Sequence, residues 1–489
     1  MDETNSGLNE TPCSEASDAQ TPLVVDLDGT LLKTDLLLES FCRVLATRPQ
    51  RLVLLPKWLS QGKAQLKARI ADDAIVDFET LPVNTKVLEF IRQERAKGRR
   101  IFVASASDQR LVQEVADHLG PFDGIFASDG RVNLSGKAKA DRLMQEFGER
   151  GFDYVGNADA DLDIWKHANK AITANCSRKL SETVAQHCSN HMNLSTRDPA
   201  IQNYLESLRV HQWAKNILLF APMFAAHAVT PSNIGILLLA FLSFSLTASA
   251  VYLVNDLVDL PSDRDHTIKR SRPFARGAVP LLHGAVMVSV LLLIGVALAA
   301  LVSWLFLAAI AFYLLLTTSY TFYLKQKAIV DVIALAGLYT LRVIAGGAAL
   351  MVPLSVWFLA FSMFLFLSLA LVKRCAELKA RMEVGRGEPI GRGYHLDDMP
   401  LLLSLGGGAG YAAVVILALY INSPKMASLY AYPEGLWLIC VLLIYWISRM
   451  LLLTHRGTMH EDPIVFALRD RVSLFTVAIT VLIIAASSL

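Results

Sequence analysis

The sequence has little charge and few cysteines for its length. Only 18% of its 489 residues are charged, whereas 53% are hydrophobic and the mean hydropathy is +0.41. Such a composition excludes a disordered chain and a purely soluble enzyme. Lys and Arg number 46 against 44 Asp and Glu, so bulk charge gives no reason to expect nucleic-acid binding.

The six cysteines form no pattern of metal ligands or disulfides. No CxxC spacing and no His/Cys cluster occurs, so neither a zinc site nor a disulfide framework is predicted, and a reducing compartment is the simpler interpretation. Residues 1–20 are polar and acidic and lack the basic and apolar regions of a signal peptide. We therefore expect a disordered tail, followed by an amino-terminal half that stays in the cytoplasm.

Long apolar runs begin near residue 212 and continue to the end of the sequence. Each is close to the roughly 20 residues that cross a bilayer core, which predicts an all-α bundle of about nine transmembrane helices. The first is the weakest, because it is short and contains Pro222, and a bundle of eight is the alternative. The predicted spans are 212–228, 233–255, 281–300, 302–319, 329–350, 354–373, 400–421, 434–453 and 471–488.

Basic residues are distributed unequally between the predicted loops. The loops on one side are rich in Lys and Arg, whereas those on the other side contain only Lys425. Cytoplasmic loops carry such an excess, so we expect a multi-pass protein of the inner membrane whose amino-terminal half and active sites face the cytoplasm. The basic loops are 256–280, 320–328, 374–399 and 454–470.

Acidic residues gather where the second predicted span ends. Helical spacing would bring several of them together, and such carboxylates repel one another unless a cation binds. Mg²⁺ prefers hard oxygen ligands, and Arg264 and Arg272 in the basic run that follows suit a diphosphate. We predict a Mg²⁺–diphosphate site here, with Asp256 and Asp259 as its catalytic residues. The predicted metal ligands are Asn255, Asp256, Asp259 and Asp263.

Other cations of the membrane half are predicted to bind phosphate groups. Arg342 shares a helix face with Asp331 and lies about 16 Å below it. An Arg at that depth must face a polar cavity, so we interpret it as an anion site for a lipid phosphate, with an internal ion pair as the alternative. For the later arginines, such as Arg386 and Arg392, the alternative is that they only orient the neighbouring helices by the positive-inside rule. The other predicted substrate-binding residues are Lys215, Lys325, Lys373 and Arg374.

The pattern NDxxDxxxD with the following RDHTIKRSRPFARG resembles the first signature of the UbiA superfamily of intramembrane prenyltransferases, over roughly residues 205–489. The resemblance implies a nine-helix bundle with Mg²⁺ held by aspartates. The second aspartate-rich signature of most members is missing, because YTFYLKQKAIVDVIALAGLYTLRVIAGG contains only Asp331. That stretch, with LRVHQWAKN and KRCAEL, resembles the decaprenyl-phosphate phosphoribosyltransferases, which implies transfer from phosphoribosyl diphosphate to a polyprenyl phosphate in the bilayer.

The number of basic residues agrees with that branch. A phosphoribosyl transfer holds a diphosphate, a 5-phosphate and a lipid phosphate at once, which calls for more cations than a single diphosphate does. The rival enzyme is an aromatic prenyltransferase that uses a polyprenyl diphosphate. The rival of another class is a lipid-phosphate transporter or scaffold, although moving a lipid requires no acidic cluster on one face.

The soluble half has its own acidic residues where predicted strands end. Asp26 and Asp28 follow the apolar strand in TPLVVDLDGTLLKTD, and two carboxylates at that spacing can act as nucleophile and as general acid, with Mg²⁺ screening both. Ser105 ends a second strand and would hold a phosphoryl oxygen, and Lys139 or Lys137 supplies a cation. The predicted metal ligands are Asp26, Asp28, Asn157 and Asp161.

This order of motifs resembles the haloacid dehalogenase (HAD) superfamily of phosphatases, over a domain placed at residues 21–195 with a helical cap at about 36–82. Alternating strands and helices predict a doubly wound parallel sheet with its site at the carboxyl ends of the strands. Asn157 stands where the family usually has an aspartate, which should weaken metal binding and leaves a degenerate domain as the alternative. A phosphoribosyl lipid keeps a 5-phosphate, and we expect this domain to remove it.

Overall fold

The computed structural model describes residues 21–196, 200–266, 268–383, 393–459 and 462–488, so the predicted disordered tail lies outside the described residues. The chain divides into two compact units. The first contains Met1–Leu208 with Leu253–Met287, and the second contains Arg209–Tyr252 with Val288–Leu489.

The first unit is built on a six-stranded parallel sheet. Its strand order is β3-β2-β1-β4-β5-β6, and every neighbouring pair is parallel, which confirms the predicted doubly wound sheet. The chain builds outward from β1 in one direction and then from β4 in the other, and ligands bind at such reversals in α/β sheets. The strands are β1 (Leu23–Asp26), β2 (Ile101–Asp108), β3 (Gly124–Ser128), β4 (Asp153–Gly156), β5 (Ala171–Cys176) and β6 (His191–Thr196). The helices that follow are α5 (Thr85–Ala96), α6 (Gln109–Leu119), α7 (Lys137–Phe147), α8 (Leu162–Trp165) and α9 (Arg178–His187).

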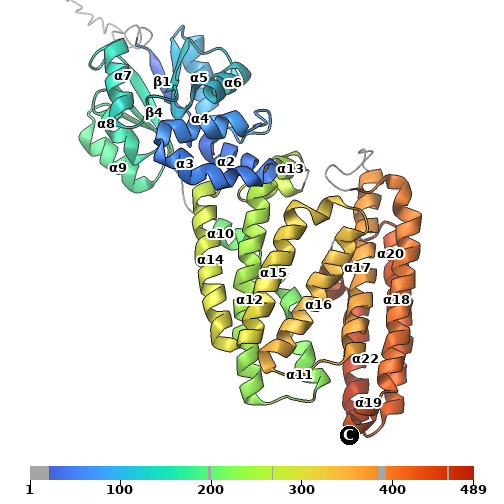
Figure 1. The fold of residues 1–489 in the computed structure, drawn as a ribbon. Coiled ribbons are helices and arrows are strands. Elements are labelled where there is room, and N and C mark those ends of the chain that lie inside the picture. The colour runs from blue at the N-terminus through green and yellow to red at the C-terminus, as the bar shows by residue number, and fades with distance from the viewer. Residues whose placement is uncertain (1–20, 197–199, 267, 384–392, 460–461, 489) are drawn as a thin grey trace, which may run out of the picture. The chain divides into compact units, whose positions relative to one another are not determined.

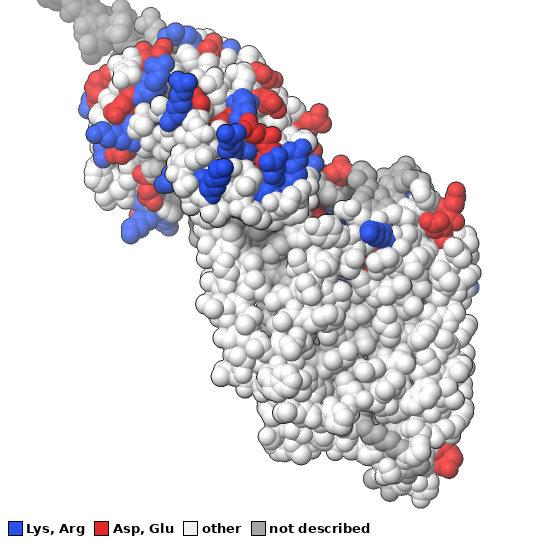
Figure 2. Space-filling view, viewed as in Figure 1, with Lys and Arg blue, Asp and Glu red and all other residues white. Residues whose placement is uncertain are grey.

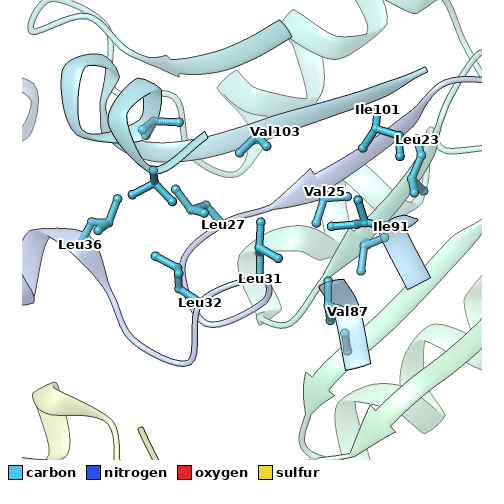
Figure 3. Close-up of a cluster of buried hydrophobic side chains, with 14 of the residues drawn as sticks. Leu23, Val25, Leu27, Leu31, Leu32, Leu36, Val87, Ile91, Ile101 and Val103 are labelled. Carbon is cyan, nitrogen blue, oxygen red and sulfur yellow. The ribbon is translucent and has the colours of Figure 1, made fainter. Parts of the chain in front are cut away.

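Leucines fix the loop that follows β1. Leu27 on one side of Asp28, Gly29 and Thr30, and Leu31 and Leu32 on the other, are at most 1% exposed and lie in one cluster with Val103 (Figure 3). Burying a leucine side chain stabilises a fold by about 1.5–3 kcal/mol. The apolar residues therefore hold the loop against the sheet, and the polar residues between them occupy fixed positions at the end of β1.

Four short helices lie between β1 and α5, where the sequence predicts a helical cap. They are α2 (Leu36–Thr47), η1 (Pro49–Leu54), α3 (Leu55–Ser60) and α4 (Lys63–Asp73). Their own small core contains Val44, Trp58 and Ile70. The carboxylate of Asp35 accepts a hydrogen bond of 3.0 Å from the backbone N–H of Leu38, which caps the first turn of α2.

Eight helices in the described residues are long and apolar enough to cross a membrane. Neighbouring ones pack side by side, as Figure 1 shows for α15, α16, α17 and α18. Ser303 separates α14 from α15, because its hydroxyl accepts a hydrogen bond of 3.0 Å from the N–H of Phe306. The eight are α12 (Pro231–Val258), α14 (Leu281–Val302), α15 (Trp304–Phe322), α16 (Val330–Leu350), α17 (Val356–Glu383), α18 (Met399–Ile421), α20 (Trp437–His455) and α22 (Arg471–Ser488).

Two details differ from the predicted spans. The segment predicted as a first transmembrane α-helix at 212–228 is a 3₁₀ helix, η3 (Val210–Phe220), followed by the short α11 (Ala221–Ala225). A 3₁₀ helix rises about 2.0 Å per residue, so the two elements together rise about 30 Å, close to the thickness of a hydrocarbon core. Helix α17 also continues to Glu383, so the loop predicted from residue 374 is helical at its start.

Gly346 allows η3 to lie directly against α16. A Cβ atom at Gly346 would be 2.0 Å from the carbonyl oxygen of Leu219 in η3. Gly346→Ala must therefore push the two elements apart, and we expect it to lower stability by about 1–3 kcal/mol, measured as a lower melting temperature of the purified protein. Gly408→Ala in α18 is the matched control, since no heavy atom lies within 4 Å of that position. Equal melting temperatures for the two variants would contradict this packing.

Candidate functional site

The polar residues of the soluble half meet where β1, β2 and β4 end. One carboxylate oxygen of Asp28 accepts hydrogen bonds from the hydroxyls of Ser105 at 2.7 Å and Ser107 at 2.8 Å. Its other oxygen accepts one of 2.8 Å from the backbone N–H of Leu36, at the start of α2. Ser105 was predicted at this site, whereas Ser107 was missed, although the two-residue period of a strand places both hydroxyls on one face of β2.

A second chain of contacts runs from Asp26 to Asp161. Lys139 donates to Asp26 at 2.7 Å and to the hydroxyl of Tyr154 at 3.1 Å. That hydroxyl donates in turn to Asp161 at 2.9 Å. Of the two lysines that the sequence offered, Lys139 is therefore the one that contacts Asp26. Thr30 completes the set by donating to the second oxygen of Asp26 at 2.9 Å.

Negative charge is in excess at this site. Burial raises the pKa of Asp26 to about 7; Lys139 opposes the rise, and the carboxylates of Asp161 and Asp28 add to it. A bound cation would relieve this repulsion. Asn157 also lies at the site, since a Cβ on Gly29 in the β1 loop would be 2.2 Å from its amide nitrogen. The donor set of three carboxylates and one amide is the kind that Mg²⁺ accepts.

The acidic cluster of the membrane half is arranged differently from the single helix face that its spacing predicts. Helix α12 ends at Val258 and α13 (Leu260–Asp265) begins two residues later. Asp256 and Asp263 lie together around Arg272, whose Nη1 atom is 3.1 Å from the first carboxylate and 2.6 Å from the second. Burial raises the pKa of Asp263, against the opposing effect of Arg272. Asn255 and Asp259 are half-buried.

This pair of carboxylates fits a divalent cation. Both side chains are 3% exposed, and both contact the guanidinium of Arg272. Among the described residues, no three His, Cys, Asp or Glu side chains gather as a preformed metal site. Mg²⁺ is commonly held by one or two carboxylates together with substrate phosphates, so two carboxylates are enough when the substrate supplies the rest.

Arg264 does not point at this cluster. Its guanidinium forms a two-pronged ion pair with Glu39 of α2, with distances of 2.5 and 3.2 Å, and its Nε donates to the carbonyl of Ala275 at 3.1 Å. The side chains of the pair are 6% and 5% exposed. The substrate-binding role predicted for Arg264 has no support in this geometry, and no motif in the sequence indicates Glu39 as its partner.

In the second unit, two of the predicted lysines converge on one carboxylate. Lys215 of η3 and Lys373 of α17 donate to the same oxygen of Asp462, at 2.9 and 3.0 Å. Asp462 also caps α21 (Pro463–Arg469) through the N–H of Ile464. Burial acts to raise the pKa of Asp462, but the two ammonium groups outweigh it and hold that pKa well below its usual range. Two cations around one anion leave a net positive site suited to a phosphate.

Arg374 is satisfied by protein partners. Its three nitrogens donate to Asp331 at 2.6 Å, Glu377 at 2.5 Å and the hydroxyl of Tyr320 at 2.9 Å. Asp331 accepts a further hydrogen bond from Tyr394. Arg374 and Asp331 are 2% and 0% exposed, so they form a buried ion pair that connects α16 and α17. Its predicted role in binding substrate therefore has no support here.

Arg342 has no carboxylate partner among the described residues, so the alternative of an ion pair with Asp331 is not what the structure shows. Its guanidinium donates to Asn216 of η3 at 3.0 Å and to the carbonyl of Leu338 at 2.7 Å. Three aromatic rings surround it, with centroids 5.3–5.5 Å away, and stabilise the buried cation. Lys325 is half-buried in η5 (Leu324–Gln326).

Both halves of the chain match known families. Residues 217–474 match the UbiA prenyltransferase family, and residues 23–164 match the haloacid dehalogenase-like hydrolases. The first match spans more than half of the chain, so the chain belongs to the UbiA prenyltransferase family and carries a HAD-like domain at its amino terminus. Both resemblances seen in the sequence are confirmed, and the chain is a multi-pass membrane protein of a transferase family.

Three relatives illustrate the match. An uncharacterized protein of Sinorhizobium fredii, y4nM, is 36% identical over 467 residues, which cover 94% of this chain and 89% of the relative. The nodulation protein NoeC of Azorhizobium caulinodans is 37% identical over 274 residues, covering 55% and 88%. The decaprenyl-phosphate phosphoribosyltransferase of Mycobacterium tuberculosis is 37% identical over 204 residues, covering 39% and 65%, so this chain spans somewhat less than two thirds of that enzyme.

The different surroundings of Arg374 and Arg342 can be tested by measuring the stability of variants. Arg374→Leu leaves the fully buried Asp331 without its cation, and breaking such a pair typically costs about 3–5 kcal/mol. We expect a large fall in the melting temperature of the purified protein, partly restored in the double variant Asp331→Asn/Arg374→Leu. Arg342→Leu is the matched control, because it strands no carboxylate, and its melting temperature should stay nearer that of the wild type. A lower melting temperature for Arg342→Leu than for Arg374→Leu would contradict these assignments.

Proposed function

We propose that the membrane half transfers phosphoribose from phosphoribosyl diphosphate to a polyprenyl phosphate. The observation that carries the proposal is the pair Lys215 and Lys373, which converge on one carboxylate and retain a net positive charge. A prenyl diphosphate alone needs only the acidic cluster and its arginine, whereas phosphoribosyl transfer has two further phosphates to neutralise. The similarity to decaprenyl-phosphate phosphoribosyltransferases supports the same reaction.

The residues of the acidic cluster would serve the donor. Asp256 and Asp263 would hold Mg²⁺, which when bound withdraws negative charge from the leaving diphosphate. Arg272 already contacts both carboxylates and is placed to transfer one of its hydrogen bonds to a phosphate oxygen. Asp259 lies half-buried between the two helices that carry them. The donor's diphosphate then leaves as an oxygen of the lipid phosphate attacks the anomeric carbon.

The cations of the second unit would serve the remaining phosphates. Lys215 and Lys373 neutralise the charge of a phosphate, and Asp462 keeps both ammonium groups oriented in its absence. Arg342, held by Asn216 and an aromatic cage, is the candidate for the phosphate of the lipid. No group in this set needs to form a covalent bond, so catalysis consists of positioning and charge neutralisation.

We propose that the protein lies in the inner membrane with the HAD-like domain and both sites on the cytoplasmic side. The excess of Lys and Arg in one set of loops supports this orientation.

The decisive assay offers the purified protein, in lipid with Mg²⁺, two labelled donors. We expect the label of phosphoribosyl diphosphate to enter the organic phase when a polyprenyl phosphate is present. Entry of label only from a polyprenyl diphosphate and an aromatic acceptor would favour the aromatic prenyltransferase. No covalent product from either donor would favour the transporter or scaffold.

The acidic cluster gives a prediction for the same assay. Asp256→Ala and Asp259→Ala should each lower transfer by about a hundredfold or more, because each removes charge from the proposed metal site. Asp265→Ala is the matched control, since this exposed carboxylate lies on the same short helix α13 and should be dispensable. Full activity of both cluster variants, with Mg²⁺ still required, would place the metal site elsewhere.

For the HAD-like domain we propose removal of the 5-phosphate from the lipid product. Asp26 would attack phosphorus and Asp28 would act as acid and base, with Lys139 neutralising the phosphate. The retained contacts of Asp26, Asp28, Lys139 and Asp161 favour activity despite Asn157. Fusion to the transferase keeps this site at a high effective concentration near newly made product.

This second activity is tested by the products of the intact chain. The variant Asp26→Asn should accumulate the phosphorylated lipid that the wild type clears, because it lacks the nucleophile. Asp163→Asn is the matched control, since that carboxylate is half-exposed and pairs with the exposed Lys166. Products that stay phosphorylated in the wild type as in the Asp26 variant would leave the domain a structural or regulatory role.

A further inference from the structure

The cap helices contain a long run in which every charged residue is basic. No Asp or Glu occurs from residue 40 to residue 71. This composition is unusual in a chain whose net charge is only +2, and it falls on four consecutive elements, α2, η1, α3 and α4. The basic residues in it are Arg43, Arg48, Arg51, Lys57, Lys63, Lys67 and Arg69.

The same segment exposes large apolar side chains. Trp58, Leu54 and Leu55 belong to the small core of the cap. In contrast, Val53 is 82% exposed and Leu59 is 58% exposed. Lys57 and Lys63 are exposed next to them in sequence, and no described Asp or Glu lies within ion-pair distance of either ammonium group. Figure 2 shows Lys and Arg side chains gathered over α3 and α4. An exposed surface that is both basic and apolar is typical of proteins that bind the interface of a bilayer.

The first unit ties this surface to a residue that closely follows an apolar helix. Arg264 follows the end of the apolar helix α12, at Val258, by only six residues, and therefore lies near the membrane surface. Its buried ion pair with Glu39 holds the first turn of α2 at the same level. Helix α2 is about 18 Å long, so η1 and α3, which follow it directly, remain within reach of the headgroups.

We propose that η1, α3 and the start of α4 form a surface that binds anionic phospholipid headgroups of the bilayer in which the chain is embedded. Lys57 and Lys63 would pair with the headgroup phosphates, and Val53 and Leu59 would enter the interface between headgroups and acyl chains. Arg48 and Arg51 add to the positive field, although each is partly neutralised by Asp73, at 3.1 and 3.6 Å. The docking does not depend on which reactions the two sites carry out.

Hydrogen exchange of the full-length protein in lipid nanodiscs tests this surface. Amides of residues 49–63 should exchange more slowly in discs of phosphatidylglycerol than in discs of phosphatidylcholine. Basic residues are attracted to an anionic surface, so the double reversal Lys57→Glu/Lys63→Glu should lower the docked population by at least about tenfold and restore fast exchange. Lys86→Glu/Lys179→Glu, on exposed positions of α5 and α9, is the matched control and should leave the protection unchanged.

The exchange rates of the wild type, the cap variant and the control variant distinguish the outcomes. Protection in anionic discs that disappears only in the cap variant, with unchanged exchange in the strands, supports the proposal. Equal exchange in both kinds of disc, or protection that survives the reversal of Lys57 and Lys63, overturns it. Protection lost equally in the control variant also overturns it, because net charge and not this surface would then be responsible. Transfer and phosphatase activities play no part in the readout, so failure of the proposed function leaves this result interpretable.

Discussion

A charge buried away from water must be compensated, and this constraint arranges the polar residues of both units. The interior stabilises an ion only when opposite charges or oriented dipoles surround it. Removing one partner of a buried pair therefore strongly lowers the stability of the fold. Here Asp331 has Arg374, Glu39 has Arg264, and Asp462 has two lysines. Arg342 is compensated by the faces of three aromatic rings instead. Each arrangement fixes the relation between two helices as well as neutralising charge.

The same constraint separates structural charges from chemical ones. Arg374 and Arg264 have every nitrogen engaged by protein acceptors and are therefore part of the framework. The carboxylates of Asp256 and Asp263 share the guanidinium of Arg272, and Lys215 and Lys373 share the carboxylate of Asp462. The proposed phosphate sites lie at groups of this second kind.

Local patterns in the sequence predicted the parts of the fold that depend on local physics. Alternating strands and helices indicated the sheet, and short motifs indicated Asp26, Asp28, Asp256 and Asp263. Long apolar runs indicated about nine spans, of which eight are long α-helices in the described residues. Residues that act through distant contacts were missed: Asp462 lies 247 residues from Lys215, and Glu39 lies 225 from Arg264. The 3₁₀ form of η3 was also missed, because apolar composition does not distinguish a helix with i→i+3 hydrogen bonds from an α-helix.

The ion pair between Glu39 and Arg264 bears on how modular the chain is. A gene fusion normally joins domains that can be cut apart at the linker, but here Glu39 belongs to the HAD-like half of the sequence and Arg264 to the UbiA half. Cutting between the two would strand a buried guanidinium in one fragment and a buried carboxylate in the other, each a penalty of several kcal/mol unless water reaches it. The HAD-like and UbiA parts of the sequence are therefore joined by a buried ion pair as well as by a peptide bond.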